Sequence, residues 1–130
     1  MRAAAVIPAA GSGTRIGAGQ PKQYLLLAGV PVLVHTVRAF VAAPCIDQIV
    51  VVVPSERLEA TRELLRNHGL DHDSVILTPG GLRRQDSVLA GLGCLDLTID
   101  IVLVHDGARP LVTSELIARC YQAAQDHGAA

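Results

Sequence analysis

The sequence predicts an α/β fold: a single domain, residues 1–130, built on a doubly wound, mostly parallel sheet. Two observations predict it. Short apolar runs alternate with segments of helical periodicity, as in successive strand–helix–strand units with right-handed crossovers. The run from Gln48 to Val53 is almost continuously β-branched, which is typical of a strand buried on both faces of a parallel sheet. With 50% hydrophobic and 18% charged residues, the chain is apolar enough to form a core.

The amino-terminal half supplies the first two strands and the helix between them. Residues 3–7 form a short apolar run, and Gln48–Val53 is the second strand. Pro31 suits the first position of a helix, and Pro44 ends it. The buried face of this helix is expected to consist of apolar residues at helical spacing: Leu33, Val37, Phe40 and Val41.

The second helix is expected to begin at a cap formed by Ser55, with Glu56 and Glu59 near its positive end. It closes near Gly69, because glycine accepts the left-handed conformation that ends many helices. A short third strand, residues 75–77, follows.

The carboxyl-terminal half repeats the pattern. A helix runs from about Arg84 to Leu92, and residues 99–104 form the fourth strand. Thr113 or Ser114 caps a last helix. Its apolar stripe is expected to contain Leu116, Ile117, Cys120, Tyr121 and Ala124.

Bulk properties exclude several classes of function. A net charge of −1 and only three aromatic residues give no basis for binding nucleic acid or an anionic membrane. No apolar run is long enough to span a membrane, and the amino terminus lacks the pattern of a signal peptide. Three widely spaced cysteines, Cys45, Cys94 and Cys120, predict reduced core thiols. These features together predict a cytoplasmic protein.

The glycine-rich segment from Pro8 to Lys22 follows the first strand and is the main candidate site. Glycines allow close approach to a ligand, and successive backbone N–H groups form a concave anion site. Arg15 and Lys22 are the only charged residues of this segment, which indicates a ligand with several negative charges, such as a nucleoside triphosphate. A merely flexible loop is the alternative. Expected contacts to the nucleotide come from Pro8, Ala9, Ala10, Gly11, Ser12 and Gly13.

This segment matches neither of two common glycine-rich patterns. No Gly-Lys pair follows Gly11 and Gly13, so the segment is not a P-loop. The dinucleotide fingerprint would require a third glycine at position 16, which is Ile16. Lys22 is the single lysine among eleven basic residues, which favours a role for a compact ammonium that reaches a phosphate, although one surface lysine could also arise by chance.

Two further polar segments are expected beside this loop, because ligands bind at the carboxyl ends of the strands in such sheets. Asp106 follows the fourth strand and is a candidate Mg²⁺ ligand, since Mg²⁺ takes one or two carboxylates plus substrate phosphates. The alternative is a structural pair with Arg109. The other segment offers polar groups to a base or ribose, or serves as an ordinary turn and helix cap: Gly80, Gly81, Arg83, Arg84, Asp86 and Ser87.

With these residues laid out, the chain resembles the 2-C-methyl-D-erythritol 4-phosphate cytidylyltransferase family, from residue 3 to its end. The first and last matching stretches occur in looser form across nucleotidyltransferases, and the middle two are more specific. The four stretches are Pro8–Arg15, Pro21–Leu25, Asp86–Gly91 and Val104–Pro110. The resemblance implies the Rossmann-like fold of a nucleotidyltransferase, incomplete at its carboxyl end.

The family's reaction, as the resemblance implies it, joins CTP to a polyol phosphate. The phosphate of methylerythritol phosphate attacks the α-phosphorus of CTP and pyrophosphate leaves, with Mg²⁺ as cofactor. By position, Arg15 and Lys22 resemble the catalytic cations and Asp106 the metal carboxylate. Ala108 and Arg109 belong to the same strand-exit motif as Asp106. The residues that resemble those around cytosine and ribose are Ala9, Ala10, Gly11, Gly81 and Ser87.

Two departures from the family matter. Leu82 stands where an acidic or polar residue is common, which weakens the expected base or ribose contact there. Family members also continue well beyond residue 130, with further substrate ligands and an arm that reaches a second subunit. We therefore expect a nucleotide-binding part of a homodimeric enzyme that turns over poorly alone, with an exposed sheet edge that favours association.

Three other functions stay open at the level of sequence. A cytidylyltransferase for another polyol phosphate, such as ribitol 5-phosphate, would use the same loop. A nucleotide-binding module without catalysis would fit the length. A dinucleotide oxidoreductase is the remaining alternative.

Overall fold

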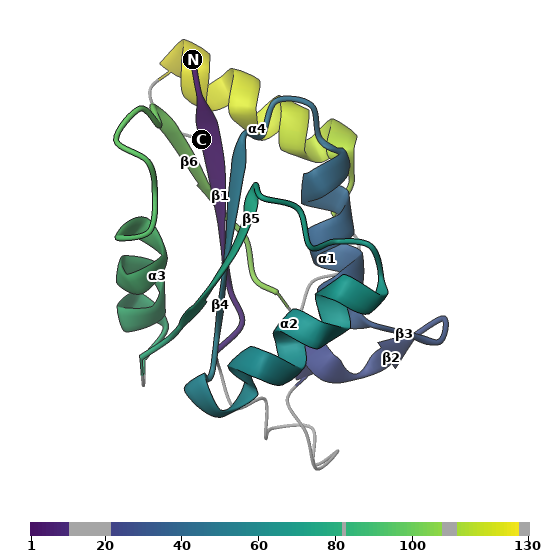
Figure 1. The fold of residues 1–130 in the computed structure, drawn as a ribbon. Coiled ribbons are helices and arrows are strands. Elements are labelled where there is room, and N and C mark those ends of the chain that lie inside the picture. The colour runs from purple at the N-terminus through teal and green to yellow at the C-terminus, as the bar shows by residue number, and fades with distance from the viewer. Residues whose placement is uncertain (11–21, 82, 108–111, 128–130) are drawn as a thin grey trace.

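The computed structural model describes residues 1–10, 22–81, 83–107 and 112–127, and the central element of this fold is a parallel sheet (Figure 1). Its four strands lie in the order β5-β4-β1-β6, and every neighbouring pair is parallel. The strands are β1 (Ala3–Pro8), β4 (Gln48–Val53), β5 (Val75–Pro79) and β6 (Ile101–Val104). Strand β1 therefore lies between β4 and β6. The chain winds from β1 to β4 and β5 in one direction and returns to the other side of β1 for β6, so the winding direction changes between β1 and β6.

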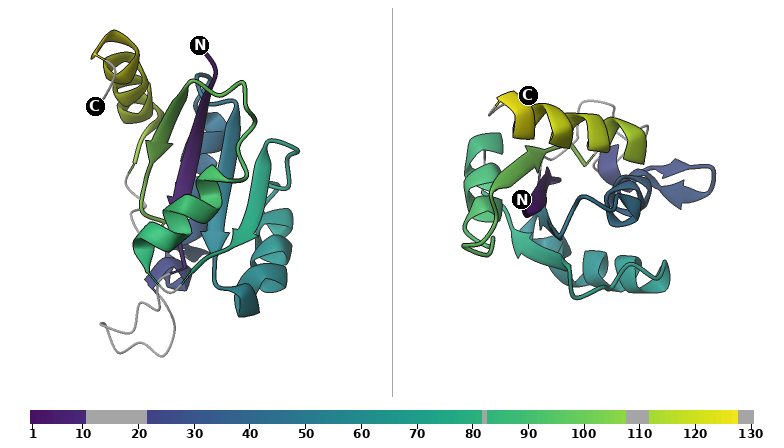
Figure 2. Two further views of the ribbon diagram at one scale, coloured as in Figure 1. Left: turned by 90° about the vertical axis from the view of Figure 1, so that its left-hand side faces the viewer. Right: turned by 90° about the horizontal axis from the view of Figure 1, so that it is seen from above.

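Helices cover both faces of this sheet, as the view from above in Figure 2 shows. Helix α3 (Arg84–Leu92) lies alone on one face, against β1, β4 and β5. The opposite face carries α1 (Val32–Ala42), α2 (Leu58–Asn67) and α4 (Ser114–His127). The predicted doubly wound α/β fold is confirmed.

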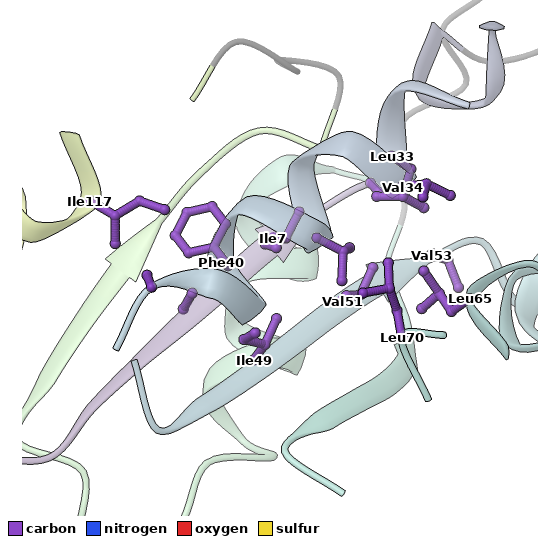
Figure 3. Close-up of a cluster of buried hydrophobic side chains, with 14 residues drawn as sticks. Ile7, Leu33, Val34, Phe40, Ile49, Val51, Val53, Leu65, Leu70 and Ile117 are labelled. Atoms are coloured by element: carbon purple, nitrogen blue, oxygen red, sulfur yellow. The ribbon is translucent and has the colours of Figure 1, made fainter. Parts of the chain in front are cut away.

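The larger core cluster fills the space between the sheet and the three helices on that face (Figure 3). Alternate residues of β1 and β4 point into it, as the period of a strand requires. Side chains from α1, α2 and α4 pack against them. The large members that Figure 3 labels are Ile7, Leu33, Val34, Phe40, Ile49, Val51, Val53, Leu65, Leu70 and Ile117.

The intervening strand residues Val6, Val50 and Val52 form a smaller cluster under α3. Gly91 brings the α3 backbone close to this cluster: a Cβ at this glycine would lie 2.5 Å from Val6 Cγ1. Residues 49–53 of β4 are buried, which confirms the prediction that this strand is covered on both faces, and all of β1 is buried as well.

Several predicted element ends are confirmed. Strand β4 has the expected bounds, α3 begins at Arg84, and α2 ends before Gly69, whose φ of +71° is left-handed. Thr113 caps α4, because its hydroxyl accepts a hydrogen bond of 3.1 Å from the Leu116 N–H. Strand β6 begins at Ile101, two residues later than predicted.

Other local predictions were wrong. A short 3₁₀ turn, η3 (Ser55–Arg57), precedes α2, and Ser55 donates to Glu56 rather than capping the helix. The predicted stripe of α4 is mostly not buried: Ile117 is buried, whereas Leu116 is 47% exposed, because this helix packs along β6 and the end of α1 and not onto a broad surface. Val41 of α1 is only partly buried.

A small antiparallel hairpin lies outside the main sheet. It pairs β2 (Leu26–Leu27) with β3 (Val30–Pro31), directly after the 3₁₀ turn η2 (Lys22–Tyr24). This pairing was not predicted from the sequence. Pro31 ends β3 and stands just before α1, which begins at Val32.

The three cysteines are free thiols, as expected, but each is only partly buried, so the prediction of core positions was too strong. Within the described residues, no helix combines the length and the apolar character needed to cross a membrane.

Candidate nucleotide-binding site

The candidate residues gather where three parallel strands end. Strand β1 ends at Pro8, β5 at Pro79 and β6 at Val104, and parallel strands present their carboxyl ends at one edge of a sheet. The predicted loop segments therefore leave the same edge, beside the change of winding direction between β1 and β6. This is the place at which doubly wound sheets bind ligands.

The exit of β1 is held in place by two hydrogen bonds at Ala9. The Ala9 N–H donates to the carbonyl of Val52 at 2.7 Å, and the side-chain amide of Gln23 donates to the carbonyl of Ala9. Gln23 is nearly fully buried. The residue that follows Lys22 thus anchors the two ends of the glycine-rich segment to each other.

At Gly80, the predicted nucleotide-binding segment that follows β1 meets the one that follows β5. A Cβ at Gly80 would lie 2.5 Å from Ala10 Cβ, 2.7 Å from Ser87 Oγ and 2.9 Å from Val52 Cγ1. Only a glycine allows the exits of β1 and β5 and the first turn of α3 to approach this closely. Its N–H donates to the Val53 carbonyl at 2.8 Å, which fixes the turn to β4.

The start of α3 is held by Asp86. Its carboxylate accepts hydrogen bonds of 3.3 Å from the backbone N–H and from the Nε of Arg83. A carboxylate in the first turn also interacts favourably with the helix dipole. Ser87 is only 2% exposed, and a Cβ at Gly81 would collide with Asp86. The contacts of Asp86 are those of a helix cap, one of the two roles that the sequence left open.

The exit of β6 packs against the exit of β1. The Gly107 N–H donates to the Pro8 carbonyl at 3.1 Å, and a Cβ at Gly107 would lie 2.9 Å from Ala9 Cβ. On the other side, the hydroxyl of Thr36 in α1 donates to the Gly107 carbonyl at 3.2 Å. Asp106 therefore sits in a turn whose backbone is fixed on two sides.

Arg84, in the first turn of α3, reaches across to this turn. Its guanidinium lies 4.0 Å from Asp106 Oδ2, and both side chains are partly exposed. The sequence placed Arg84 near a base or ribose and considered Arg109 as the partner of Asp106. The pairing with Arg84 follows from the packing of α3, which sequence spacing does not reveal. His105, next to Asp106, packs against Phe40 of α1, with ring centroids 5.5 Å apart.

Several predicted site residues lie outside the described residues: Gly11, Ser12, Gly13, Arg15, Ala108 and Arg109. Lys22 begins η2, and the structure describes its backbone position only. The described residues that come together at one edge are Pro8, Ala9, Ala10, Gly80, Gly81, Asp86, Ser87 and Asp106.

Tyr24 anchors the segment that carries Lys22 to α2. Its hydroxyl hydrogen-bonds with the Thr61 hydroxyl at 2.8 Å, and the Arg57 guanidinium lies over its ring, 4.7 Å from the centroid. Burial raises the pKa of Tyr24 above its ordinary value of 10.0, and the hydrogen bond with Thr61 and the charge of Arg57 oppose this rise.

Gln23, Tyr24 and Thr36 were not among the residues predicted for the site. Thr36 carried a signal that could have been noticed, since it lies one turn from Leu33 and Phe40 on a helix face predicted to be apolar. Gln23 and Tyr24 lie in the matching stretch Pro21–Leu25, but nothing in that stretch indicated their contacts with Ala9 and Thr61.

The described residues contain no group of three or more histidine, cysteine or acidic side chains that could hold a metal alone. Asp106 is a single carboxylate at the site edge. Such a donor fits Mg²⁺ only if the remaining ligands come from substrate phosphates and water, which is the usual manner of Mg²⁺ binding.

Comparison with known proteins decides the family. Residues 3–130 match the family model described as IspD, 2-C-methyl-D-erythritol 4-phosphate cytidylyltransferase. The chain belongs to this family. The resemblance that the sequence motifs indicated is thereby confirmed.

Curated relatives agree with this membership. The chain is 56% identical, over 97% of its length, to the bifunctional enzyme IspD/IspF of Desulfotalea psychrophila. It is 45% identical, over 96% of its length, to the 2-C-methyl-D-erythritol 4-phosphate cytidylyltransferase of Streptomyces avermitilis. It spans 32% of the first protein and 50% of the second, so it covers half of these relatives or less.

Solved structures share the fold. The 4-diphosphocytidyl-2C-methyl-D-erythritol synthase of Anaerococcus prevotii aligns with a TM-score of 0.79 at 29% identity, over 94% of this chain and 50% of that one. The IspD protein of Francisella tularensis aligns with a TM-score of 0.70 at 31% identity, over 96% of this chain and 52% of that one. The Rossmann-like fold expected of a nucleotidyltransferase is confirmed by these likenesses.

Proposed function

We propose that this chain is the CTP-binding part, residues 1–130, of a 2-C-methyl-D-erythritol 4-phosphate cytidylyltransferase. The whole protein would transfer CMP from CTP to the acceptor phosphate in isoprenoid biosynthesis. An oxygen of the acceptor phosphate attacks the α-phosphorus, the bond to the bridging oxygen breaks, and its electron pair leaves with pyrophosphate. Membership of the family supports this reaction.

One observation carries the proposal. The predicted nucleotide-binding residues Ala10 and Ser87 both pack against Gly80, where a Cβ would lie 2.5 Å from Ala10 Cβ and 2.7 Å from Ser87 Oγ. Arg84, from the same segment as Ser87, lies 4.0 Å from Asp106. Backbone groups at such an edge can recognise a base and ribose without large side chains, and the tight packing keeps them in place before the ligand arrives.

Charge stabilisation would come from the basic residues of the first segment. We assign Arg15 and Lys22 to the triphosphate and the leaving pyrophosphate, where a cation counters the charge that develops in the transition state. Gln23 and Tyr24 hold the backbone next to Lys22 in place. Gly11, Ser12, Gly13, Ala108 and Arg109 complete the nucleotide site in this proposal.

A magnesium ion would be held by Asp106 together with the phosphates of CTP, and it would draw electron density from the phosphorus under attack. The turn that fixes Asp106 suits such a ligand, because its backbone is bonded at Gly107 on both sides. We further propose a cytoplasmic protein that acts as a homodimer in its whole form, as the resemblance implies.

The test is pyrophosphate release by the whole protein, supplied with Mg²⁺, CTP and methylerythritol phosphate. Its mass is measured first, to establish the length of the polypeptide. We expect turnover with CTP, and a loss of about 10²- to 10³-fold in kcat for Lys22→Ala, which removes one stabilising charge. Turnover with ribitol 5-phosphate but not methylerythritol phosphate would overturn the assignment of the acceptor.

Calorimetry separates binding from catalysis. CTP titrated with Mg²⁺ into the 130-residue chain should bind, and Lys22→Ala should weaken that binding. Lys22→Arg keeps the charge but not the compact ammonium, so it should recover only part of the affinity. Binding of NAD but not of CTP would contradict the proposal.

A further inference from the structure

A hydroxyl in the buried face of α1 is not explained by packing. Thr36 is 0% exposed and lies among the apolar residues Leu33, Val37 and Phe40. Valine has nearly the same shape and no polar atom. Burial of a hydroxyl costs free energy unless it is hydrogen-bonded, so the partners of this hydroxyl indicate what it does.

Among the described residues, the Thr36 hydroxyl contacts two acceptors of different kinds. One is the Val32 carbonyl of the preceding turn, at 3.3 Å, a bond available to any helical threonine. The other is the Gly107 carbonyl at 3.2 Å, from a residue 71 positions away in the chain. The second bond joins α1 to the turn after β6.

This bond acts on a turn that has little freedom. The Gly107 N–H already donates to the Pro8 carbonyl at 3.1 Å. A Cβ at Gly107 would lie 2.9 Å from Ala9 Cβ and 3.2 Å from Leu33 Cδ1, so the backbone there is packed against the exit of β1 and against α1. The Thr36 hydroxyl satisfies the remaining backbone group of Gly107, on the side opposite Pro8.

We infer that Thr36 is a positioning residue for the site: through Gly107 it sets where the Asp106 carboxylate stands relative to the Ala9 loop. The inference rests on the proposed function for its catalytic consequence, and on the two hydrogen bonds of Gly107 for its structural one. The Arg84 guanidinium lies 4.0 Å from this carboxylate, on the side of α3. Thr36 touches no reacting atom.

The first test measures the turn directly, by amide hydrogen exchange in the whole protein. Thr36→Val keeps the shape and removes the donor. We expect exchange of the Gly107 N–H to rise about five- to tenfold, the effect of losing a hydrogen bond of about 1 kcal/mol. The Gly80 N–H, bonded to Val53, should not change. Thr36→Ser keeps a hydroxyl and should restore protection at Gly107.

The matched control is Thr61→Val. Thr61 is also 0% exposed and also makes a hydrogen bond between elements, to Tyr24, but it has no bond to the Gly107 turn. It should lower stability without affecting exchange at Gly107. An equal rise in both valine variants would overturn the inference, because it would indicate general loosening.

The second test is kinetic. In the whole protein, Thr36→Val should lower kcat by about tenfold, as expected of a misplaced group, with a smaller change in KM for CTP, and Thr36→Ser should recover most of it. If Gly107 responds as expected but the wild type transfers no cytidylyl group, the positioning of the turn stands and the proposed function fails. If the wild type is active and Thr36→Val changes neither readout, the inference fails and the function stands.

Discussion

Gly91 illustrates how single residues set the distance between α3 and the sheet. A Cβ at this position would lie 2.5 Å from Val6 Cγ1 and 3.1 Å from Val52 Cγ2, in a fully packed cluster. Alanine gains about 1 kcal/mol over glycine in a helix, but overpacking a core costs about 1–3 kcal/mol. We expect Gly91→Ala to lower the free energy of unfolding by up to about 2 kcal/mol, measured by urea denaturation.

Gly93, two residues later, provides the control. Its φ is −65°, and a Cβ there would meet nothing closer than 3.5 Å. Gly93→Ala should therefore be neutral or stabilising, because it only reduces the freedom of the unfolded chain. A stabilising Gly91→Ala would contradict the close packing of α3.

Tyr24 makes stability depend on pH in the alkaline range. Burial raises its pKa above 10.0 in the folded state, so the folded protein holds this proton more tightly than the unfolded chain does. The resulting stability is fully present below pH 10.0 and is lost as the pH rises through the folded-state pKa. We expect the free energy of unfolding to fall more steeply above pH 10.0 in the wild type than in Tyr24→Phe.

Tyr121→Phe removes the other tyrosine and serves as the comparison. If Tyr24→Phe leaves the dependence of the unfolding free energy on pH unchanged, burial of the Tyr24 hydroxyl does not cause the loss of stability at alkaline pH.

The sequence predicted that certain described residues gather at one edge of the sheet, but not which residues hold them there. Ala9, Ala10, Gly80 and Ser87 could be predicted because small residues after a strand have a recognised purpose. Gln23 and Thr36 act through hydrogen bonds to the backbone of distant residues, Ala9 and Gly107. No local pattern encodes such contacts, since they depend on which elements become neighbours.

At the level of elements, the start of α3 separates the two roles left open for Asp86. Its carboxylate accepts from the backbone and side chain of Arg83. Loss of a capping carboxylate costs about 1 kcal/mol. We expect Asp86→Ala to lower the free energy of unfolding by about that amount and to weaken CTP binding only by loosening the Gly80–Gly81 turn.

Asp86→Gln distinguishes these effects, because glutamine at the third helical position can also accept a hydrogen bond from the N-cap N–H but carries no charge. It should restore stability and CTP affinity together, as seen by thermal unfolding and calorimetry. Restored stability with affinity still lost would mean that the carboxylate itself contacts the nucleotide.

The errors in the predicted elements share a physical cause. Helical spacing indicates which side of α4 is apolar, but not how much surface is available to cover it, and β6 together with the end of α1 buries only Ile117 fully. At Ser55, a 3₁₀ turn takes the place of the first helical turn, so the expected cap has no helix end to satisfy. The β4 strand was predicted correctly because β-branched residues buried on both faces have few alternatives.

At the scale of the whole molecule, topology brings distant segments to one site. The strand order β5-β4-β1-β6 puts the exits of β1 and β6 next to each other, although about a hundred residues separate them in the chain. The alternation of strands and helices in the sequence predicts a parallel sheet but does not fix the order of its strands. The neighbours of β1 could not be deduced from the sequence without the resemblance to a family.

The same order leaves β6 at one edge of the sheet, as expected, within the part of the chain that the structure describes. Val102 and Val104 point to the face of α3 and are 36% and 46% exposed. An edge with unpaired backbone groups and apolar side chains is a template for pairing with another chain. We therefore expect the 130-residue polypeptide to self-associate with rising concentration, as measured by sedimentation velocity.

Val104→Lys should reduce this association, because a charge on an edge strand must be desolvated when a second strand pairs with it. Leu97→Lys adds the same charge at a fully exposed position outside β6 and should change the association much less. Both variants make the same change in net charge, so a difference between them measures the position and not the charge. If the two variants reduce association equally, β6 is not the surface through which the chains associate. If the wild-type polypeptide is a monomer at every concentration, the β6 edge does not pair with another chain.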